Sequence, residues 1–446
     1  MQGLIMSDKS SGVSANFADY KPLFDRNAAL VEANRCLNCY DAPCIRACPT
    51  SINVPGFIKK IASDNMRGSA RLILEANILG ASCARVCPTQ ELCEGACVLH
   101  DLHEEPISIG RLQRYATDQV VLGGKGAALF TQGPTNGKKV ALVGAGPASL
   151  GCAAELAQLG YEAVCFEKAD QPGGLNSFGI ADYKMDYETA LAEIAWVKQL
   201  GVDIRCNTEV GRDIAIDAML ADYDAVFLGI GLDGVGPIGI PGEELDGVRD
   251  CLEFIAELKT QPKDDVSLVG KSVAVLGGGN TAIDAVTQAA RLGAKHVYLV
   301  YRRTQAAMGA YKHEQELARK DGGIFVMEAQ PVAVLGTSGK VSGLKCTRTR
   351  VTDAGFEYIA GSEFVLEVDV VLRATGQSKL VEFLGRFDGL KLDSKGRVEA
   401  DENGRTSVEK IWTGGDCVSG GKEVVNAVAE GKRAAHSIHE YLQGAR

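Results

Sequence analysis

The sequence lacks several features, and each absence excludes a class of protein. Its 446 residues contain no run of about eighteen apolar residues, so we expect no transmembrane helix. The net charge is −10 and no basic cluster is present, which argues against binding to nucleic acids. The first residues, MQGLIMSDKSSG, have neither a basic start nor an apolar stretch, so we expect no secretory signal and a cytoplasmic protein.

Cysteine is present in unexpected number. A cytoplasmic protein rarely keeps disulfides, yet this chain has 14 cysteines. Eight of them lie between Cys36 and Cys97. The apolar residues between these eight recur every three or four positions, as in 57–80, and this predicts an α-helical metal-binding domain over residues 1–130. The other six stand alone, as expected of small buried side chains, at positions 152, 165, 206, 251, 346 and 417.

The eight clustered cysteines form two groups with ferredoxin-like spacing. They read Cys36-x2-Cys39-x4-Cys44-x3-Cys48-Pro49 and Cys83-x3-Cys87-Pro88-x4-Cys93-x3-Cys97. In two-cluster ferredoxins the last cysteine of a run ligates the other cluster. The same logic predicts two [4Fe–4S] clusters, one held by Cys36, Cys39, Cys44 and Cys97, and the other by Cys48, Cys87 and Cys93.

This grouping leaves the fourth ligand of the second cluster open. On spacing alone, Cys83 is a candidate. Structural zinc is the main alternative to an iron–sulfur centre, because zinc takes cysteine and histidine ligands and His100 and His103 are close in the sequence. A set of disulfides fits the expected compartment poorly.

A glycine-rich linker at 121–139 precedes a change to repeated units of strand, glycine-rich turn and helix. In the first unit, glycines after the strand VALV let a pyrophosphate approach the start of the next helix. An acid ends the following strand, where it can bind an adenosine ribose, and a Gly-Gly turn comes next. We expect a dinucleotide site formed by Gly144, Gly146, Pro147, Ala148, Glu167, Gly173 and Gly174.

The second unit repeats the pattern over 271–303. We expect its glycine-rich turn to bind a second dinucleotide through Gly277, Gly279, Asn280 and Thr281. The strand that follows ends in Arg302 and Arg303 instead of an acid. A basic strand end suits a 2′-phosphate, which favours NADPH over NADH, and a solvated surface pair is the alternative.

Two later motifs complete the nucleotide-binding half. We expect cofactor contacts from a turn after an apolar strand, Thr375 and Gly376, and from a strand end before the last helix, Gly415 and Asp416. If the C-terminal part completes the first nucleotide domain, the second domain is inserted within it. We therefore expect an α/β fold with two Rossmann-like domains, FAD binding at 131–250 and 373–446 and NAD(P)H binding at 251–372.

These motifs together resemble the flavoproteins that have two dinucleotide-binding domains. A thioredoxin-reductase activity would need a redox-active Cys-x-x-Cys in the nucleotide domains, where the cysteines of this chain are isolated. Three segments resemble more specifically the PreT-type flavin/iron–sulfur subunits of bacterial dihydropyrimidine dehydrogenase: RCLNCYDAPCIRACPTSINVPGFI, LGASCARVCPTQELCEGAC and PISIGRLQRYATD. The resemblance to glutamate synthase small subunits is more distant.

The resemblance implies a ligand and a function. A glutamine in the third segment is a cluster ligand in the dihydropyrimidine enzymes, and Gln113 holds that position here, which favours Gln113 over Cys83. The family passes a hydride from NAD(P)H to FAD, and then electrons through two [4Fe–4S] clusters. Its partner subunit carries FMN and iron–sulfur clusters and reduces uracil or thymine, so we expect a hetero-oligomer and no catalytic acid or base in this chain. The alternative is a glutamate synthase small subunit.

The chain departs from that family in two places. Residues 179–186 read GIADYKMD where the family often has Gly-Ile-Pro-x-Phe-Arg-Leu-Pro, so we expect different contacts near the flavin. Gly309 stands where the eukaryotic enzyme has a further arginine for the 2′-phosphate, which weakens the preference for NADPH.

Overall fold

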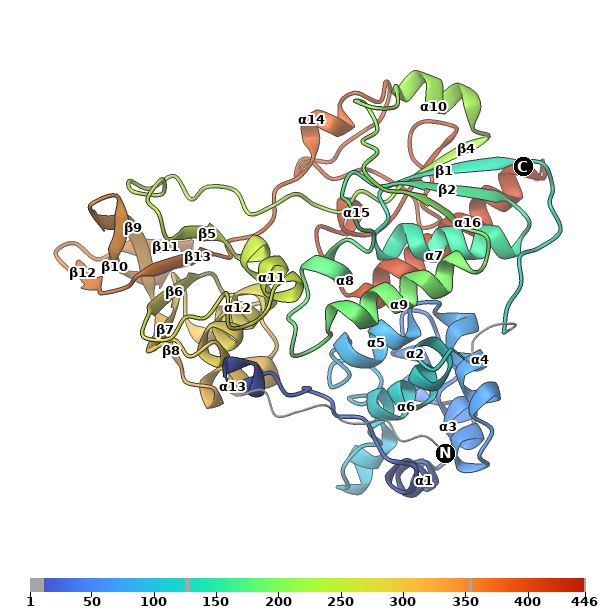
Figure 1. Ribbon diagram of the computed structural model, residues 1–446, viewed down its shortest axis with the longest axis horizontal. Helices are drawn as coiled ribbons and strands as arrows, with labels where there is room; N and C mark the ends of the chain where they lie inside the picture. The colour runs from blue at the N-terminus through green and yellow to red at the C-terminus, as the bar shows by residue number, and fades with distance from the viewer. Residues whose placement is uncertain (1–11, 125–128, 353–354, 445–446) are drawn as a thin grey trace. The chain divides into compact units, whose positions relative to one another are not determined.

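The computed structural model describes residues 12–124, 129–352 and 355–444, so part of the glycine-rich linker lies outside the described residues (Figure 1). The chain forms two compact units. The larger unit contains the helical cysteine domain and the first nucleotide domain, over Tyr20–Ser177, Lys184–Asp233 and residues 379–444. The smaller unit contains the second nucleotide domain, formed by Gly234–Ser378 with Phe178–Tyr183 and residues 12–19.

The cysteine domain is α-helical, as its apolar spacing predicts. Short polar side chains start three of its helices, because Asp25, Asn53 and Asn65 each accept a hydrogen bond from a backbone amide of the first turn. Phe57 and Ile61 are completely buried in its core. The elements are α1 (Arg26–Asn34), α2 (Pro43–Arg46), α3 (Val54–Ala62), α4 (Met66–Ala76), α5 (Gly80–Val86), η2 (Val98–Leu102) and α6 (Ile109–Val121).

The first nucleotide domain is built on a parallel sheet. Within the described residues its order is β14-β4-β1-β2-β3, for β14 (Ile411–Thr413), β4 (Ala225–Leu228), β1 (Lys139–Val143), β2 (Glu162–Phe166) and β3 (Asp203–Arg205). Because β14 comes from the C-terminal part of the chain, that part completes the first domain, which confirms the predicted insertion. The helices are α7 (Pro147–Gln158), α8 (Leu175–Phe178), α9 (Tyr187–Lys198), α10 (Ile216–Asp222), α14 (Val381–Leu384), α15 (Asp416–Ser419) and α16 (Val424–Leu442).

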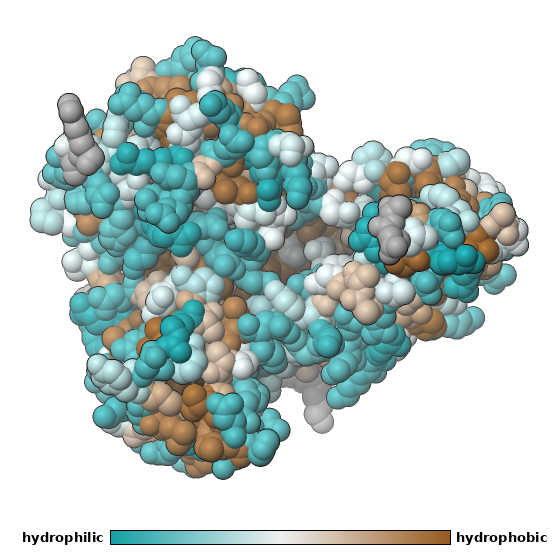
Figure 2. Space-filling view, turned by 180° about the vertical axis from the view of Figure 1, so that it is seen from behind, coloured by the Kyte–Doolittle hydropathy of each residue, from teal (hydrophilic) through white to brown (hydrophobic). Residues whose placement is uncertain are grey.

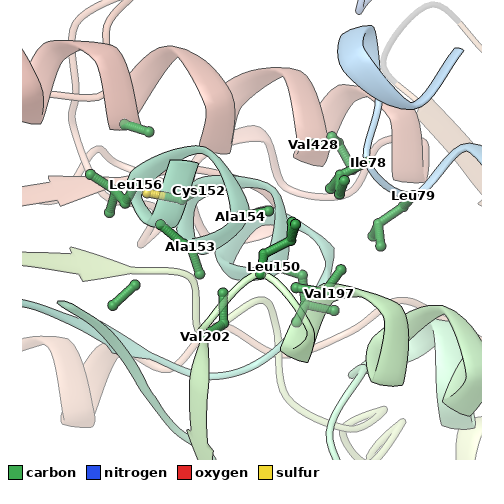
Figure 3. Packing of buried hydrophobic residues seen from close by; sticks show 14 of the residues in the cluster. Ile78, Leu79, Leu150, Cys152, Ala153, Ala154, Leu156, Val197, Val202 and Val428 are labelled. Atoms are coloured by element: carbon green, nitrogen blue, oxygen red, sulfur yellow. The ribbon is translucent and has the colours of Figure 1, made fainter. Parts of the chain in front are cut away.

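Helices α7 and α16 pack closely because each has a glycine that faces the backbone of the other helix. A Cβ on Gly431 of α16 would lie 2.0 Å from the carbonyl oxygen of Ala148, and a Cβ on Gly151 of α7 would lie 3.1 Å from that of Val428. Figure 3 shows the result: α7 side chains meet Val428 of α16 and also Ile78 of the cysteine domain. One hydrophobic core therefore continues from the cysteine domain into the first nucleotide domain.

The smaller unit has a second parallel sheet. Its order within the described residues is β5-β13-β6-β7-β8, for β5 (Val248–Asp250), β13 (Val370–Arg373), β6 (Ser272–Leu276), β7 (His296–Tyr301) and β8 (Gly323–Met327). The helices are η1 (Val13–Asn16), α11 (Cys251–Thr260), α12 (Asn280–Arg291), η3 (Gln305–Ala307) and α13 (Lys312–Lys320). An antiparallel sheet, which our sequence analysis missed, adds β9 (Ala329–Thr337), β10 (Lys340–Thr352), β11 (Gly355–Tyr358) and β12 (Phe364–Leu366).

The face drawn in Figure 2 is mostly hydrophilic, with hydrophobic side chains in separate areas. Among the described residues, no helix combines the length and the apolar character that crossing a bilayer requires.

The close packing of α7 and α16 predicts the effect of adding one methyl group. Gly431→Ala should lower the free energy of unfolding by roughly 1–3 kcal/mol, because the new Cβ overlaps the Ala148 carbonyl oxygen. Gly309→Ala is the matched control, since a Cβ there meets nothing within 4 Å. Denaturant unfolding monitored by circular dichroism measures both variants, and equal stability of the two would contradict the prediction.

Candidate functional site

The first cysteine set shares one pocket. Cys36, Cys39, Cys44 and Cys97 line it, although Cys97 lies 53 residues beyond Cys44 in the sequence. This is the grouping that the ferredoxin logic predicts. The rest of the wall is apolar, with side chains from α3, η2, the segment before α6 and the first residue of α6: Val54, Ile58, Leu99, Ile107 and Ile109.

The electrostatics of this pocket suit a positively charged centre. Burial, together with the neighbouring thiols of Cys36, Cys97 and Cys39, raises the pKa of Cys44 to about 11. Burial also raises the pKa of Cys36. Several thiolates confined in an apolar pocket repel one another, and iron removes this cost because it binds the thiolate form. Four soft sulfur donors with apolar walls fit an iron–sulfur cluster.

The second cysteine set lies where α5 ends. Cys87 follows the last residue of α5 and is buried. Burial, and then the charges of Glu94, Cys87 and Cys48, raise the pKa of Cys93 well above its usual range. Cys48, Cys87 and Cys93 are thus brought together from three separate segments. This arrangement also fits a cluster with three cysteine ligands and one further ligand.

Both candidates for the further ligand contact helix α5. Cys83 is one turn before Cys87 on α5, and its thiol hydrogen bonds with that of Cys87 and accepts a hydrogen bond from Asn77 Nδ2 at 3.1 Å. Gln113 is buried on α6, and its Nε2 donates to the carbonyl oxygen of Gly80 at 2.8 Å. Since the amide nitrogen is used in this bond, the oxygen is the atom of Gln113 that can bind iron. The choice of ligand stays a prediction.

Zinc is the alternative metal for these cysteines and for the two nearby histidines. In the part of the chain that the structure describes, no group of three or more His, Cys, Asp or Glu side chains is placed to hold a single metal ion. Of the two nearby histidines, His100 directs Nε2 to the carbonyl oxygen of Glu94, at 3.2 Å.

The first glycine-rich turn joins β1 to α7. Gly144 has a φ of +87°, and a Cβ there would lie 2.8 Å from the carbonyl oxygen of Gly229, so only glycine fits. Gly146 is the N-cap of α7, and a Cβ on it would meet nothing within 4 Å. The open space beside the first amides of α7 suits a pyrophosphate. Pro147 and Ala148 form the first turn of that helix.

The predicted partners of this turn gather around it. Glu167 accepts hydrogen bonds from the backbone amides of Ala145 and Ala169, at 2.8 and 2.9 Å, so its carboxylate holds the turn in place. Gly173 donates to the carbonyl oxygen of Ala145, and a Cβ on Gly174 would lie 3.2 Å from Gly146 Cα. The glycines therefore form one cradle.

The C-terminal motif reaches the same cradle. A Cβ on Gly415 would lie 3.0 Å from the Cβ of Ala148, which places this strand end beside the start of α7. Burial raises the pKa of Asp416, and this carboxylate accepts a hydrogen bond from the backbone amide of Lys422 at 3.0 Å. The first glycine-rich turn, Glu167, Gly415 and Asp416 thus lie together in the larger unit, whereas residues 234–250 and 373–378 of the predicted FAD domain belong to the smaller unit.

The second glycine-rich turn joins β6 to α12 in the smaller unit. Gly277 has a φ of +149°, and a Cβ on it would lie 2.2 Å from the carbonyl oxygen of Ala374. The Thr375–Gly376 turn therefore lies beside this second cradle, in the smaller unit. Gly279 is the N-cap of α12 and has open space around it. Asn280, followed by Thr281 in α12, accepts a hydrogen bond from the backbone amide of Tyr311.

The two arginines at the end of β7 differ in their surroundings. Arg302 is exposed, and its guanidinium lies 5.0 Å from the ring centroid of Phe356, a residue of the antiparallel sheet. Arg303 is half-buried, and its carbonyl oxygen accepts a hydrogen bond from the Glu328 amide. An exposed guanidinium near the second turn can bind a phosphate.

The second cysteine set also contacts the first nucleotide domain. Cys83 and Cys87 pack with Val424 and Val425, the first residues of α16, which follows the Gly415–Asp416 motif. Helix α5 also contacts α9 of the same domain. The second set therefore packs against the domain in which the FAD cradle is predicted.

A buried carboxylate lies in this contact, and the sequence analysis missed it. Glu193 of α9 is 1% exposed and accepts hydrogen bonds from the backbone amides of Ala81 and Ser82. Burial raises the pKa of Glu193 to about 7, whereas the hydrogen bonds from Ser82 and Ala81 and the charge of Arg85 act to lower it. The sequence signal was a charged residue between apolar neighbours in α9, LAEIAWV.

Comparisons with known proteins agree with this division of the chain. A family model described as dihydropyrimidine dehydrogenase domain II, 4Fe-4S cluster, matches residues 13–124. A second model, described as pyridine nucleotide-disulphide oxidoreductase, matches residues 138–431.

Curated relatives match over nearly the whole chain. The glutamate synthase [NADPH] small chain of Escherichia coli (strain K12) is 38% identical, with 95% of this chain and 93% of that protein covered. The NAD-dependent dihydropyrimidine dehydrogenase subunit PreT of the same strain is 35% identical, with 95% and 97% covered. The subunit beta of the NADP(+)-dependent formate dehydrogenase of Moorella thermoacetica is 36% identical, with 90% and 60% covered.

Solved structures share the fold of the nucleotide-binding part. T. acidophilum thioredoxin reductase has a TM-score of 0.56 at 22% identity, covering 69% of this chain and 99% of that chain. Mycobacterium tuberculosis FprA in complex with NADPH has a TM-score of 0.55 at 18% identity, covering 69% and 85%. At these identities the likeness concerns the fold alone.

The buried Glu193 predicts a pH dependence of stability. Because folding raises its pKa from 4.5 to about 7, the folded state binds the proton more tightly, and the free energy of unfolding should fall as the pH rises through this interval. The fall should be on the order of 3 kcal/mol. Glu193→Gln, which cannot ionise, should be flatter than the wild type in urea unfolding between about pH 5 and pH 8. Parallel pH curves for the two proteins would contradict the prediction.

Proposed function

Because this chain belongs to the pyridine nucleotide-disulphide oxidoreductases and has a dihydropyrimidine-dehydrogenase-type 4Fe-4S domain before them, we propose that it is the electron-input subunit of an NAD(P)H-dependent dihydropyrimidine dehydrogenase. Flavin, when bound, accepts an electron pair as a hydride and releases electrons one at a time. The chain needs no side chain as acid or base for that exchange. Its residues hold the carriers and set the distances between them.

One observation carries the proposal: the second cysteine set packs against the flavin domain through α9 and α16. The first set lies in its own pocket, walled by the cysteine domain. This supports an order in which electrons leave FAD for the cluster at Cys48, Cys87 and Cys93, and then reach the cluster at Cys36, Cys39, Cys44 and Cys97. Two clusters are part of the proposal, and the second cradle would hold NAD(P)H.

The nicotinamide preference rests on the exposed Arg302. A guanidinium in this place suits the 2′-phosphate of NADPH, so we favour NADPH. The relatives differ on this point, since the PreT protein is named as NAD-dependent and the glutamate synthase chain carries NADPH in its name. We also propose a cytoplasmic location and a partner subunit with FMN and iron–sulfur clusters that reduces uracil or thymine.

A glutamate synthase small subunit is the second candidate. It is favoured by the 38% identity over 444 residues to the Escherichia coli small chain. The pyrimidine candidate is favoured by Gln113, because the resemblance to the dihydropyrimidine enzymes makes a glutamine at this position a cluster ligand. The two candidates share the electron-input role and differ in the partner.

Anaerobic purification with the native partner should separate the two candidates. We expect NADPH oxidation that depends on uracil or thymine and is faster than NADH oxidation. The loss of nicotinamide absorbance measures both rates. Oxidation that depends on 2-oxoglutarate with glutamine, and not on pyrimidines, would replace the first candidate by the second. If neither NADPH nor NADH bleaches the flavin, both candidate functions are contradicted.

Iron analysis tests the ligand sets. Cys97→Ser should lower the iron content from about eight to about four atoms per chain, because one of two [4Fe–4S] clusters loses a ligand. Cys206→Ser is the matched control, since Cys206 is also partly exposed but lies outside both sets. Full iron content in Cys97→Ser would show that the sets are wrong.

The same preparations distinguish Gln113 from Cys83. If Gln113 is the fourth ligand, Gln113→Ala should change the electron paramagnetic resonance spectrum of one reduced cluster, and Cys83→Ser should leave it unchanged. The opposite pattern would assign the position to Cys83.

A further inference from the structure

A residue of the neighbouring domain caps the first backbone amides of helix α5. A helix leaves its first amide groups without partners inside the helix, and Leu79, the N-cap of α5, has no side-chain capping bond. Glu193 of α9 supplies the acceptor instead. Its Oε1 accepts from the amides of Ala81 and Ser82 at 2.8 and 3.1 Å, and its Oε2 accepts from the Ser82 hydroxyl.

A residue of α8, close in sequence to the predicted FAD cradle, bonds to the same hydroxyl. Asn176 is 3% exposed, lies two residues after Gly174 and donates from Nδ2 to Ser82 Oγ at 3.1 Å. Its Oδ1 is buried and makes no hydrogen bond in the described structure. Leaving such an oxygen unpaired costs about 1–3 kcal/mol, so the position of Asn176 is not explained by stability alone. Asn176, Ser82 and Glu193 form a continuous buried bridge.

The bridge ends next to the second cysteine set. Ser82 precedes Cys83 directly, and Cys87 lies at the other end of the same short helix. A displacement of α5 would therefore move this set relative to the flavin cradle. The rate at which an electron passes between two carriers falls steeply with their separation, so a small movement here would have a large effect.

We propose that Glu193 is a positioning residue for electron transfer from the flavin to the second cluster. It fixes α5 against the first nucleotide domain through the amides of Ala81 and Ser82. Asn176 of α8 donates to the Ser82 hydroxyl, which is also bound to Glu193. No bond is made or broken at Glu193, and the residue acts through Ala81 and Ser82. This inference rests on the proposed function, because it takes FAD and the second cluster to be the carriers on either side of the bridge.

Single-turnover kinetics of the anaerobic holoenzyme with NADPH test the inference. Bleaching of the flavin reports hydride transfer, and cluster reduction reports the next step, with iron content measured on the same samples. Glu193→Ala should leave the first phase and the iron content unchanged and slow the second phase by about tenfold. Glu193→Gln should restore the second phase, because its amide oxygen still accepts from both backbone amides.

Two further variants make the result specific. Glu155→Ala removes a partly buried carboxylate that pairs with Lys432 and His436 within the flavin domain, and it should not affect the second phase. Ser82→Ala removes only the shared hydroxyl, so it tests the bridge if Glu193→Ala does not fold, and it should slow the second phase.

The outcomes separate the inference from the proposed function. A wild type without flavin bleaching or without iron contradicts the proposed function. A wild type with both phases contradicts the inference if Ser82→Ala and Glu193→Ala leave the second phase unchanged, or if Glu155→Ala slows it equally.

Discussion

The contact between helix α5 and the first nucleotide domain is the constraint on which the rest of the structure depends. Electron carriers must lie close together, and the protein can ensure this only by packing the elements that hold them. Helix α5 meets both α9 and α16, and one hydrophobic core continues from Ile78 into α7. The cysteine domain and the first nucleotide domain consequently form one compact unit. The sequence patterns of the two domains differ, and they do not indicate that the domains share one core.

The fold was predictable where local patterns are strong. Glycine-rich turns between an apolar strand and a helix identify both Rossmann-like domains, because only glycine allows the backbone approach seen at Gly144 and Gly277. The insertion of one domain in the other also followed from the order of motifs, and β14 confirms it. The antiparallel sheet was missed, although its longest strand, β10, alternates buried and exposed positions over much of its length.

Contacts between distant segments were less predictable. The spacing of cysteines suggested which sulfurs meet, but it could not choose between Cys83 and Gln113. Cys83 bonds to Cys87 one helical turn away, whereas Gln113 reaches α5, at Gly80, only after α5 and α6 pack together. The same limit applies to Glu193, whose partners are more than a hundred residues away in the sequence. Nothing in residues 12–19 indicates that they fold with the second nucleotide domain, where Val13 donates to Asp264.

The pairing of Cys97 with the first cysteine run has a consequence for chain topology. With both centres loaded, each cluster joins the segment before α3 to the segment after α5, and so closes a long loop of the polypeptide. Cross-links of this kind restrict the unfolded chain and thereby favour the folded domain. The two proposed clusters would then stabilise the fold as well as transfer electrons, and loss of iron would destabilise the whole N-terminal domain.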